Sequence, residues 1–198
     1  MLDILKIGHT LESCEVLRKL FDLRRRPFRI RIISPLIKSV QIDDFRFLNT
    51  LRRLLASGTT VTIITRNFVK KKIELLEKIE SLKQELKEGR ITKDYYQHLL
   101  DGYSRRLKNV EKTESMFEQL NALNASIFCQ KRIHAKMIIV ESKKENIALV
   151  MSANITPTGL SKSIEVGVIL NDQACINKIN TYVDKIIDYG GTTPYGVV

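Results

Sequence analysis

Tryptophan is absent from the 198-residue sequence, and cysteine, proline and glycine are scarce, with 3, 4 and 9 residues. So little glycine and proline excludes a collagen-like repeat, and three cysteines without a CxxC pair exclude a disulfide framework or a common zinc site. We therefore expect Cys14, Cys129 and Cys175 to be reduced, buried thiols.

Long apolar runs are also missing. No stretch of about 18 uninterrupted apolar residues occurs, which disfavours a membrane-spanning helix. Asp3, Lys6 and His9 interrupt the N-terminal region in which a secretory signal needs its apolar core. We expect a cytoplasmic protein without membrane contact.

Enough apolar residues are present to build a core, since 43% of the chain is hydrophobic and 28% is charged. The spacing of these residues predicts an α/β fold, with a mixed, mostly parallel sheet flanked by helices. The expected helices are 11–23, 44–56 and 172–189. The expected strands are 28–34, 60–65, 126–129, 133–140, 147–151 and 165–170, followed by a tail expected to be a loop.

Residues 68–123 interrupt this alternation of strands and helices. Apolar residues recur there at helical spacing on both sides of a Lys87-Glu88-Gly89 stop, which predicts an antiparallel helical hairpin. The chain would then be one domain, residues 1–198, with the hairpin inserted into it. Such a hairpin could be a solvated decoration, or it could contact a second copy or nucleic acid.

The formal net charge is +11, and the excess is unevenly distributed. Residues 1–66 have 13 basic and 6 acidic side chains, residues 67–112 have 12 and 8, and residues 113–198 have 8 of each. A basic first half favours a polyanionic partner, either nucleic acid or an anionic membrane surface. The candidate nucleic-acid contacts are Arg24, Arg25 and Arg26, which could equally do no more than solubilise a turn.

The residues best suited to chemistry lie in the last third of the chain. His134 and Lys136 would share one face of a strand, and Ser152 and Asn154 would stand in the same relation after the next strand. A neutral imidazole can attack phosphorus while an ammonium group and short hydrogen-bonding side chains hold the phosphate oxygens. Glu165 could accept the other imidazole N–H. Each residue alone has an ordinary structural explanation, and only the combination points to phosphate chemistry.

This combination resembles the phospholipase D superfamily, whose signature is His-x-Lys, four residues, Asp, then Gly-Ser-x-Asn, and a Glu eleven residues after the Asn. The chain has His-Ala-Lys at 134–136, Ser-Ala-Asn at 152–154, and a Glu at the expected distance. It departs from the signature at three positions. Glu141 replaces the Asp, Met151 replaces the Gly, and Ser163 stands where Asn often precedes the Glu. We expect Glu141 to have a structural role.

The resemblance implies a role for each residue. His134 would form a covalent phosphohistidine in one copy of the motif and protonate the leaving oxygen from another copy. Lys136, Ser152 and Asn154 would bind the phosphoryl oxygens, and Glu165 would orient His134. This mechanism needs no metal and no cofactor.

A complete site needs two copies of the motif, and this chain has one. His9 and His98 lack a Lys two residues further on, so the second copy would have to come from a homodimer. The small size, single motif and basic first half resemble the dimeric nuclease branch. The function expected is therefore a metal-independent phosphodiesterase that hydrolyses DNA or RNA.

Two alternatives stay open, because the fold does not select the substrate. The replacements at Glu141 and Met151 motivate a non-catalytic module of the same fold that binds nucleic acid or another ligand. The retained His134, Lys136, Asn154 and Glu165 argue against it, because a binding module needs no nucleophile. A lipid phosphodiesterase is the other alternative, and the lack of an apolar interfacial helix disfavours it.

Overall fold

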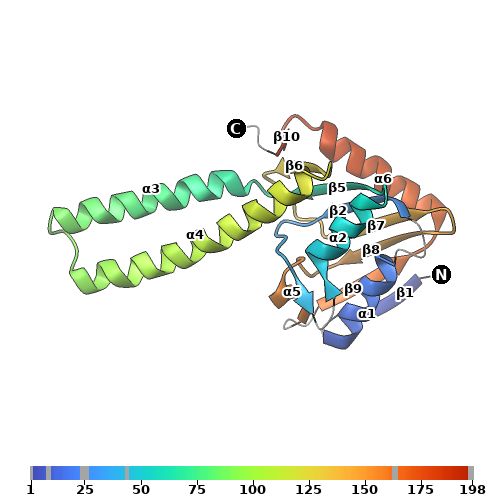
Figure 1. Ribbon diagram of the computed structural model, residues 1–198, viewed down its shortest axis with the longest axis horizontal. Coiled ribbons are helices and arrows are strands. Elements are labelled where there is room, and N and C mark those ends of the chain that lie inside the picture. The colour runs from blue at the N-terminus through green and yellow to red at the C-terminus, as the bar shows by residue number, and fades with distance from the viewer. Residues whose placement is uncertain (1, 8–9, 23–26, 43–44, 162–164, 196–198) are drawn as a thin grey trace. The chain divides into compact units, whose positions relative to one another are not determined.

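The computed structural model in Figure 1 describes residues 2–7, 10–22, 27–42, 45–161 and 165–195. It divides into two compact units. One unit combines Met1–Arg66 with Met116–Val197 and is of the α/β type, and the other is Asn67–Ser115 and is helical.

The α/β unit is built on an eight-stranded sheet in the order β1-β9-β8-β7-β2-β5-β6-β10. The strands are β1 (Leu2–Ile7), β2 (Pro27–Ile33), β5 (Thr60–Thr65), β6 (Ser126–Gln130), β7 (Met137–Ser142), β8 (Asn146–Met151), β9 (Glu165–Leu170) and β10 (Thr192–Pro194). A separate pair is formed by β3 (Gln41–Ile42) and β4 (Phe45–Arg46).

The expected α/β sheet is confirmed as a mixed sheet, but it is not mostly parallel. In the described residues, β2 pairs with β5 and β5 with β6 in parallel, and the other neighbouring strands of the large sheet are antiparallel. Connections that contain helices join both parallel pairs, whereas β7 and β8 follow each other through a short turn, which enforces antiparallel pairing.

Both faces of the central strands are buried. Successive residues of β2 point to opposite faces, and Ile32 and Ile33 are both fully buried. The face of Ile33 packs against α6 (Gln173–Asp188), whose Ile176 and Val183 belong to the same core cluster. The helix α2 (Phe47–Ala56) lies against β5, and α1 (Thr10–Leu20) adds further buried apolar side chains.

Several boundaries follow the sequence closely. The helix α2 stops before Gly58, whose φ of +86° lies in the left-handed region that glycine favours. The helix α6 begins after Asp172, whose carboxylate accepts a hydrogen bond from the Cys175 N–H and so caps the helix.

Other expectations need correction. The strand expected at 133–140 begins only at Met137, and the tail forms β10, which pairs with β6. The strand β1 was not predicted; it pairs with β9, which lies at the far end of the sequence. Of the cysteines, Cys129 is buried and burial raises the pKa of its thiol to about 11, but Cys175 is exposed on α6.

The helical unit consists mainly of α3 (Phe68–Lys87) and most of α4 (Lys93–Asn121), which lie side by side in Figure 1. Lys72 Nζ of α3 lies 2.5 Å from Glu114 Oε2 of α4, so the start of one helix faces the later part of the other. Leu75, Leu82 and Val110 are buried, as expected of an apolar seam. In the described part of the chain, no helix is long and apolar enough to span a membrane.

Candidate active site

The sequence motif maps to one edge of the sheet, where β2 and β5 end and β7 begins. The N–H of Ser34, just after β2, donates to the Ile64 carbonyl at 3.0 Å. The Met151 N–H donates to the Lys136 carbonyl at 3.0 Å, and the Ser152 N–H donates to the Val166 carbonyl at 2.9 Å. Backbone hydrogen bonds therefore hold the segments of Lys136 and Ser152 next to each other and next to the start of β9.

His134 lies in the irregular segment between β6 and β7, and its side chain is exposed. Its Nε2 lies 3.1 Å from Nη2 of Arg66, the residue that follows β5. The Nε of the same guanidinium donates to the Ile133 carbonyl at 3.4 Å. Because a guanidinium has only donors, His134 Nε2 accepts in this contact, and a neutral imidazole then carries its proton on Nδ1.

Lys136 projects from the same irregular segment rather than from the strand. Its side chain is half-buried, and Nζ donates to the backbone carbonyl of His134 at 3.2 Å. The ammonium group of Lys136 therefore lies beside the backbone of His134, whereas the guanidinium of Arg66 contacts its imidazole.

Ser152 follows β8 directly and is exposed. Its Oγ accepts a hydrogen bond from the Val166 N–H at 3.0 Å. The hydroxyl therefore helps to join the ends of β8 and β9. The hydroxyl also donates to the Val166 carbonyl at 3.4 Å. A phosphate oxygen that accepts this proton would therefore replace a long hydrogen bond.

Asn154 is half-buried, and its Oδ1 is buried without a hydrogen-bond partner among the described residues. A buried amide with an unused polar atom is costly, and such groups are often found where a ligand binds. A half-turn of the amide exchanges its oxygen and nitrogen, so Asn154 can present either a donor or an acceptor.

The turn after Asn154 is tightly packed. The Thr156 N–H donates to the Asn154 carbonyl at 2.8 Å, and α5 (Pro157–Ser161) follows. A Cβ on Gly159 would come to 2.5 Å of the Asn154 carbonyl oxygen, which only glycine avoids. Gly159 therefore fixes the backbone that carries Asn154.

Four of the expected site residues are not tested by side-chain geometry. Glu165 opens β9 and its backbone pairs with Ile7 of β1, but its side chain lies outside the described part of the structure. Arg24, Arg25 and Arg26 also lie outside the described residues.

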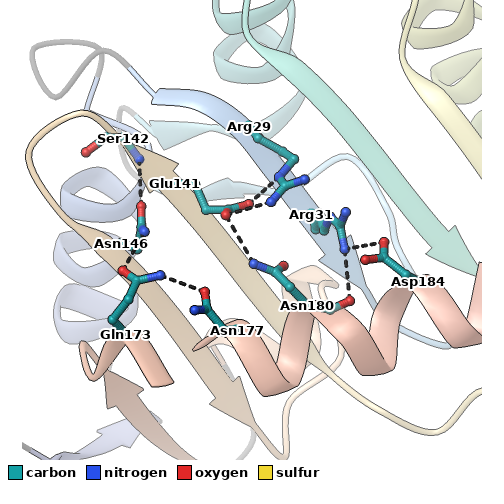
Figure 2. A network of polar contacts seen from close by, with 9 residues as sticks. All are labelled: Arg29, Arg31, Glu141, Ser142, Asn146, Gln173, Asn177, Asn180 and Asp184. Carbon is teal, nitrogen blue, oxygen red and sulfur yellow. Dashed lines mark hydrogen bonds and ion pairs between the residues drawn. The ribbon is translucent and has the colours of Figure 1, made fainter. Parts of the chain in front are cut away.

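Glu141, at the position of the signature Asp, belongs to the scaffold (Figure 2). Its buried carboxylate forms a bidentate ion pair with Arg29 of β2, in which Nη2 lies 2.7 Å from Oε1. Asn180 Nδ2 of α6 donates to the same carboxylate at 3.1 Å. The hydrogen bond with Glu141 raises the pKa of Arg29. These contacts agree with the structural role expected for Glu141.

A second ion pair ties the same strand and helix together. Arg31 Nη1 lies 2.7 Å from Asp184 Oδ1 and donates to the Asn180 carbonyl at 3.1 Å. Figure 2 shows both pairs between β2, β7 and α6, so the helix is fixed against the sheet by polar contacts as well as by its apolar face.

Among the described residues of this edge, Arg66 is one that the sequence did not single out. It lies 68 positions from His134, and nothing local marks an arginine after a strand as a partner of a distant imidazole. The one sequence feature that could have identified Arg66 is its position directly after the apolar strand expected at 60–65. Among the described residues, no group of three His, Cys, Asp or Glu side chains is arranged to hold a metal ion.

Comparison with known proteins agrees with the motif. The family model described as "Cardiolipin synthase, PLD-like domain" matches residues 29–187. The structure of Nuc from Salmonella typhimurium, a phospholipase D family member, is similar with a TM-score of 0.58 at 13% identity, covering 98% of this chain and 99% of Nuc. NucT from Helicobacter pylori has a TM-score of 0.55 at 14% identity, covering 98% and 99%.

A phosphatidylserine synthase from Haemophilus influenzae Rd KW20 has a TM-score of 0.59 at 16% identity, covering 98% of this chain and 39% of the synthase. At these identities the structural likeness shows the fold alone. No curated protein matches the sequence. Because the family model spans most of the chain and the His-x-Lys motif lies within it, the protein belongs to the phospholipase D superfamily of phosphodiester-acting enzymes.

Proposed function

We propose that the protein is a metal-independent phosphodiesterase that hydrolyses DNA or RNA through a phosphohistidine on His134. The contact between His134 Nε2 and Arg66 Nη2 at 3.1 Å carries the proposal. In this contact the lone pair of Nε2 faces the guanidinium. A phosphodiester anion that displaces the contact can bind the guanidinium while its phosphorus faces Nε2. Glu165, as the acceptor for Nδ1–H, would hold the ring in this tautomer.

The reaction has two displacements. His134 Nε2 attacks phosphorus, the bond from phosphorus to the ester oxygen breaks, and a second imidazole gives its proton to the leaving oxygen. Water then attacks the phosphohistidine, returns a proton to the second imidazole and frees Nε2. The net change is one ester bond hydrolysed by one water. Arg66, Lys136, Ser152 and Asn154 hold the charged oxygens throughout.

The second imidazole is proposed to be His134 of another copy of this chain. The sequence offers one His-x-Lys motif, so residues 1–198 supply half of the site as a single domain with the 68–123 hairpin inserted. General acid assistance contributes about 10² to 10⁴ in rate, so a separated chain should be nearly inactive.

A nucleic acid is the substrate that the charge favours. The net charge is +11, and Arg66, Lys131 and Arg132 lie in or next to the segments that carry the motif. Arg24, Arg25 and Arg26 are proposed to add phosphate contacts. Replacing these three arginines with Gln should weaken binding equally for all base sequences and flatten its salt dependence. An unchanged salt dependence of binding would show that these arginines do not contact the nucleic acid.

A lipid phosphodiester is the second substrate class to test. The matching family is described as a cardiolipin synthase domain, and one similar structure is a phosphatidylserine synthase. The same histidine chemistry would serve either substrate, so the distinction has to come from the experiment.

The test measures cleavage of labelled single-stranded DNA, duplex DNA, RNA and phosphatidylglycerol vesicles in excess EDTA. The proposal predicts cleavage of a nucleic acid by the wild type, none by His134→Ala, and unchanged cleavage by His98→Ala, a matched change of an exposed histidine on α4. Activity that EDTA abolishes and Mg²⁺ restores would contradict the mechanism. Cleavage of the lipid alone would mean that the substrate is a lipid and not a nucleic acid. Binding of nucleic acid without cleavage would indicate a non-catalytic module.

A further inference from the structure

A pocket of about 450 Å³ opens beside His134, between the segment that precedes β7 and the C-terminal half of α6. This volume falls within the range of small-ligand sites. The pocket is lined by Gln130, Arg132, Ile133, His134, Ala135, Tyr182, Lys185, Ile186 and Tyr189. All of these residues belong to the α/β unit, and the catalytic candidate itself forms part of the wall.

Two aromatic rings stand out in this wall. Tyr182 is 56% exposed and Tyr189 is 62% exposed, although both rings are large and partly apolar. Tyr182 lies on α6 and Tyr189 directly follows the end of this helix, and both rings line the same pocket. A single exposed tyrosine needs no explanation, but two that line one pocket beside a candidate nucleophile form a surface on which flat rings can stack.

Cationic groups lie between and opposite the rings. Lys185 is on α6 between the two tyrosines, Arg132 is on the opposite wall, and both are exposed. The floor is apolar, with Ile133 and Ile186. An apolar floor, aromatic walls and cations at the rim match a nucleotide, whose base is flat and whose phosphates are anionic.

The wall formed by α6 is held in position. Arg31 binds Asp184, the neighbour of Lys185, and Asn180 binds Glu141 on the side of α6 that faces the sheet (Figure 2). The pocket is therefore preformed rather than assembled by the ligand.

We propose that this pocket binds an unstacked nucleoside next to the scissile phosphate, which makes single-stranded nucleic acid the preferred substrate; this inference rests on the proposed function. A base inside a duplex is stacked on both sides and cannot reach a tyrosine ring without being flipped out. The base stacks on Tyr182 or Tyr189, and Arg132 and Lys185 bind the flanking phosphates.

The experiment measures equilibrium binding in the His134→Ala background, so that no probe is cleaved. The probes are a labelled oligothymidylate and an abasic oligonucleotide of the same length and charge. The parent should bind the oligothymidylate about five- to a hundredfold more tightly. Replacing Tyr182 and Tyr189 together with Ala should abolish that preference and leave abasic binding unchanged, whereas Phe at both positions should restore it, because stacking uses the ring and not the hydroxyl.

Tyr95→Ala is the matched control, since Tyr95 is 54% exposed on α4 and does not line the pocket. An equal loss of affinity for both probes, or an unchanged preference in the double Ala variant, would overturn the inference. If the wild type still cleaves nucleic acid in EDTA in that case, the pocket alone has failed. If the wild type neither binds nor cleaves any nucleic acid, the proposed function fails and the pocket assignment fails with it.

Discussion

The guanidinium of Arg66 meets the imidazole of His134 at 3.1 Å, across 68 positions of sequence. The contact joins the end of a parallel strand to the irregular segment before β7. It selects the tautomer in which Nε2 is unprotonated, so its lone pair can attack phosphorus once a phosphodiester displaces the guanidinium.

Arg66→Gln should therefore lower the turnover number by roughly tenfold to a thousandfold, because one charged donor to the phosphoryl oxygens is lost. Arg66→Lys should retain part of the activity, since it keeps the charge without the planar fork. Arg52→Gln, an exposed arginine on α2, serves as the control. Steady-state kinetics on a labelled oligonucleotide would check this, and equal activity of the Arg66→Gln and Arg52→Gln variants would remove Arg66 from the site.

Gly159→Ala should reduce activity roughly tenfold to a hundredfold, because a Cβ at 2.5 Å from the Asn154 carbonyl oxygen must displace the backbone of Asn154. The matched control is Gly102→Ala in α4, where a Cβ would meet no atom within 4 Å. The control should keep its activity and gain up to about 1 kcal/mol of helix stability. Activity of Gly159→Ala equal to that of the control would show that Asn154 need not be held there.

Glu141→Gln should lower the free energy of unfolding by about 1 to 3 kcal/mol, since it leaves Arg29 and Asn180 without their carboxylate. The loss is smaller than for a fully buried pair because the Arg29 side chain is 35% exposed. Denaturant unfolding, compared with Glu118→Gln on exposed α4 surface, would measure it. An unchanged stability together with lost turnover would instead indicate a role of Glu141 in the chemistry.

The sequence predicted much of this fold because most of its signals are local. Apolar runs mark β5 and β7, Gly58 ends α2, and the spacing of apolar residues predicted α3 and α4. The strand β1 was missed because its only described sheet partner, β9, is more than 150 positions away. The tail was expected to be a loop for a similar reason, since β10 forms only by pairing with β6.

The candidate site likewise contains residues that the sequence predicted and residues that only the folded structure identifies. The sequence identified His134, Lys136, Ser152 and Asn154 because they follow one motif, in the segments just before β7 and just after β8. Arg66 is not visible, since a crossover of two long helices separates it from His134. The spacing of Tyr182 and Tyr189 is ordinary for a helix, and only the folded chain brings them to the segment that carries His134.

The shared site predicts a particular dependence on subunit composition. When His134→Ala chains are mixed and refolded with wild-type chains, activity should fall with the square of the wild-type fraction, because each site needs two intact histidines. Mixing with His98→Ala chains should leave activity unchanged. A linear fall with the His134→Ala chains would mean that each chain works alone.

The stereochemical course at phosphorus tests the central claim most directly. A chiral phosphorothioate diester would be cleaved in ¹⁸O water and excess EDTA, and the configuration of the product determined. Two successive displacements, on His134 and then on the phosphohistidine, predict net retention of configuration. Net inversion would mean that water attacks phosphorus directly, and it would contradict the phosphohistidine mechanism.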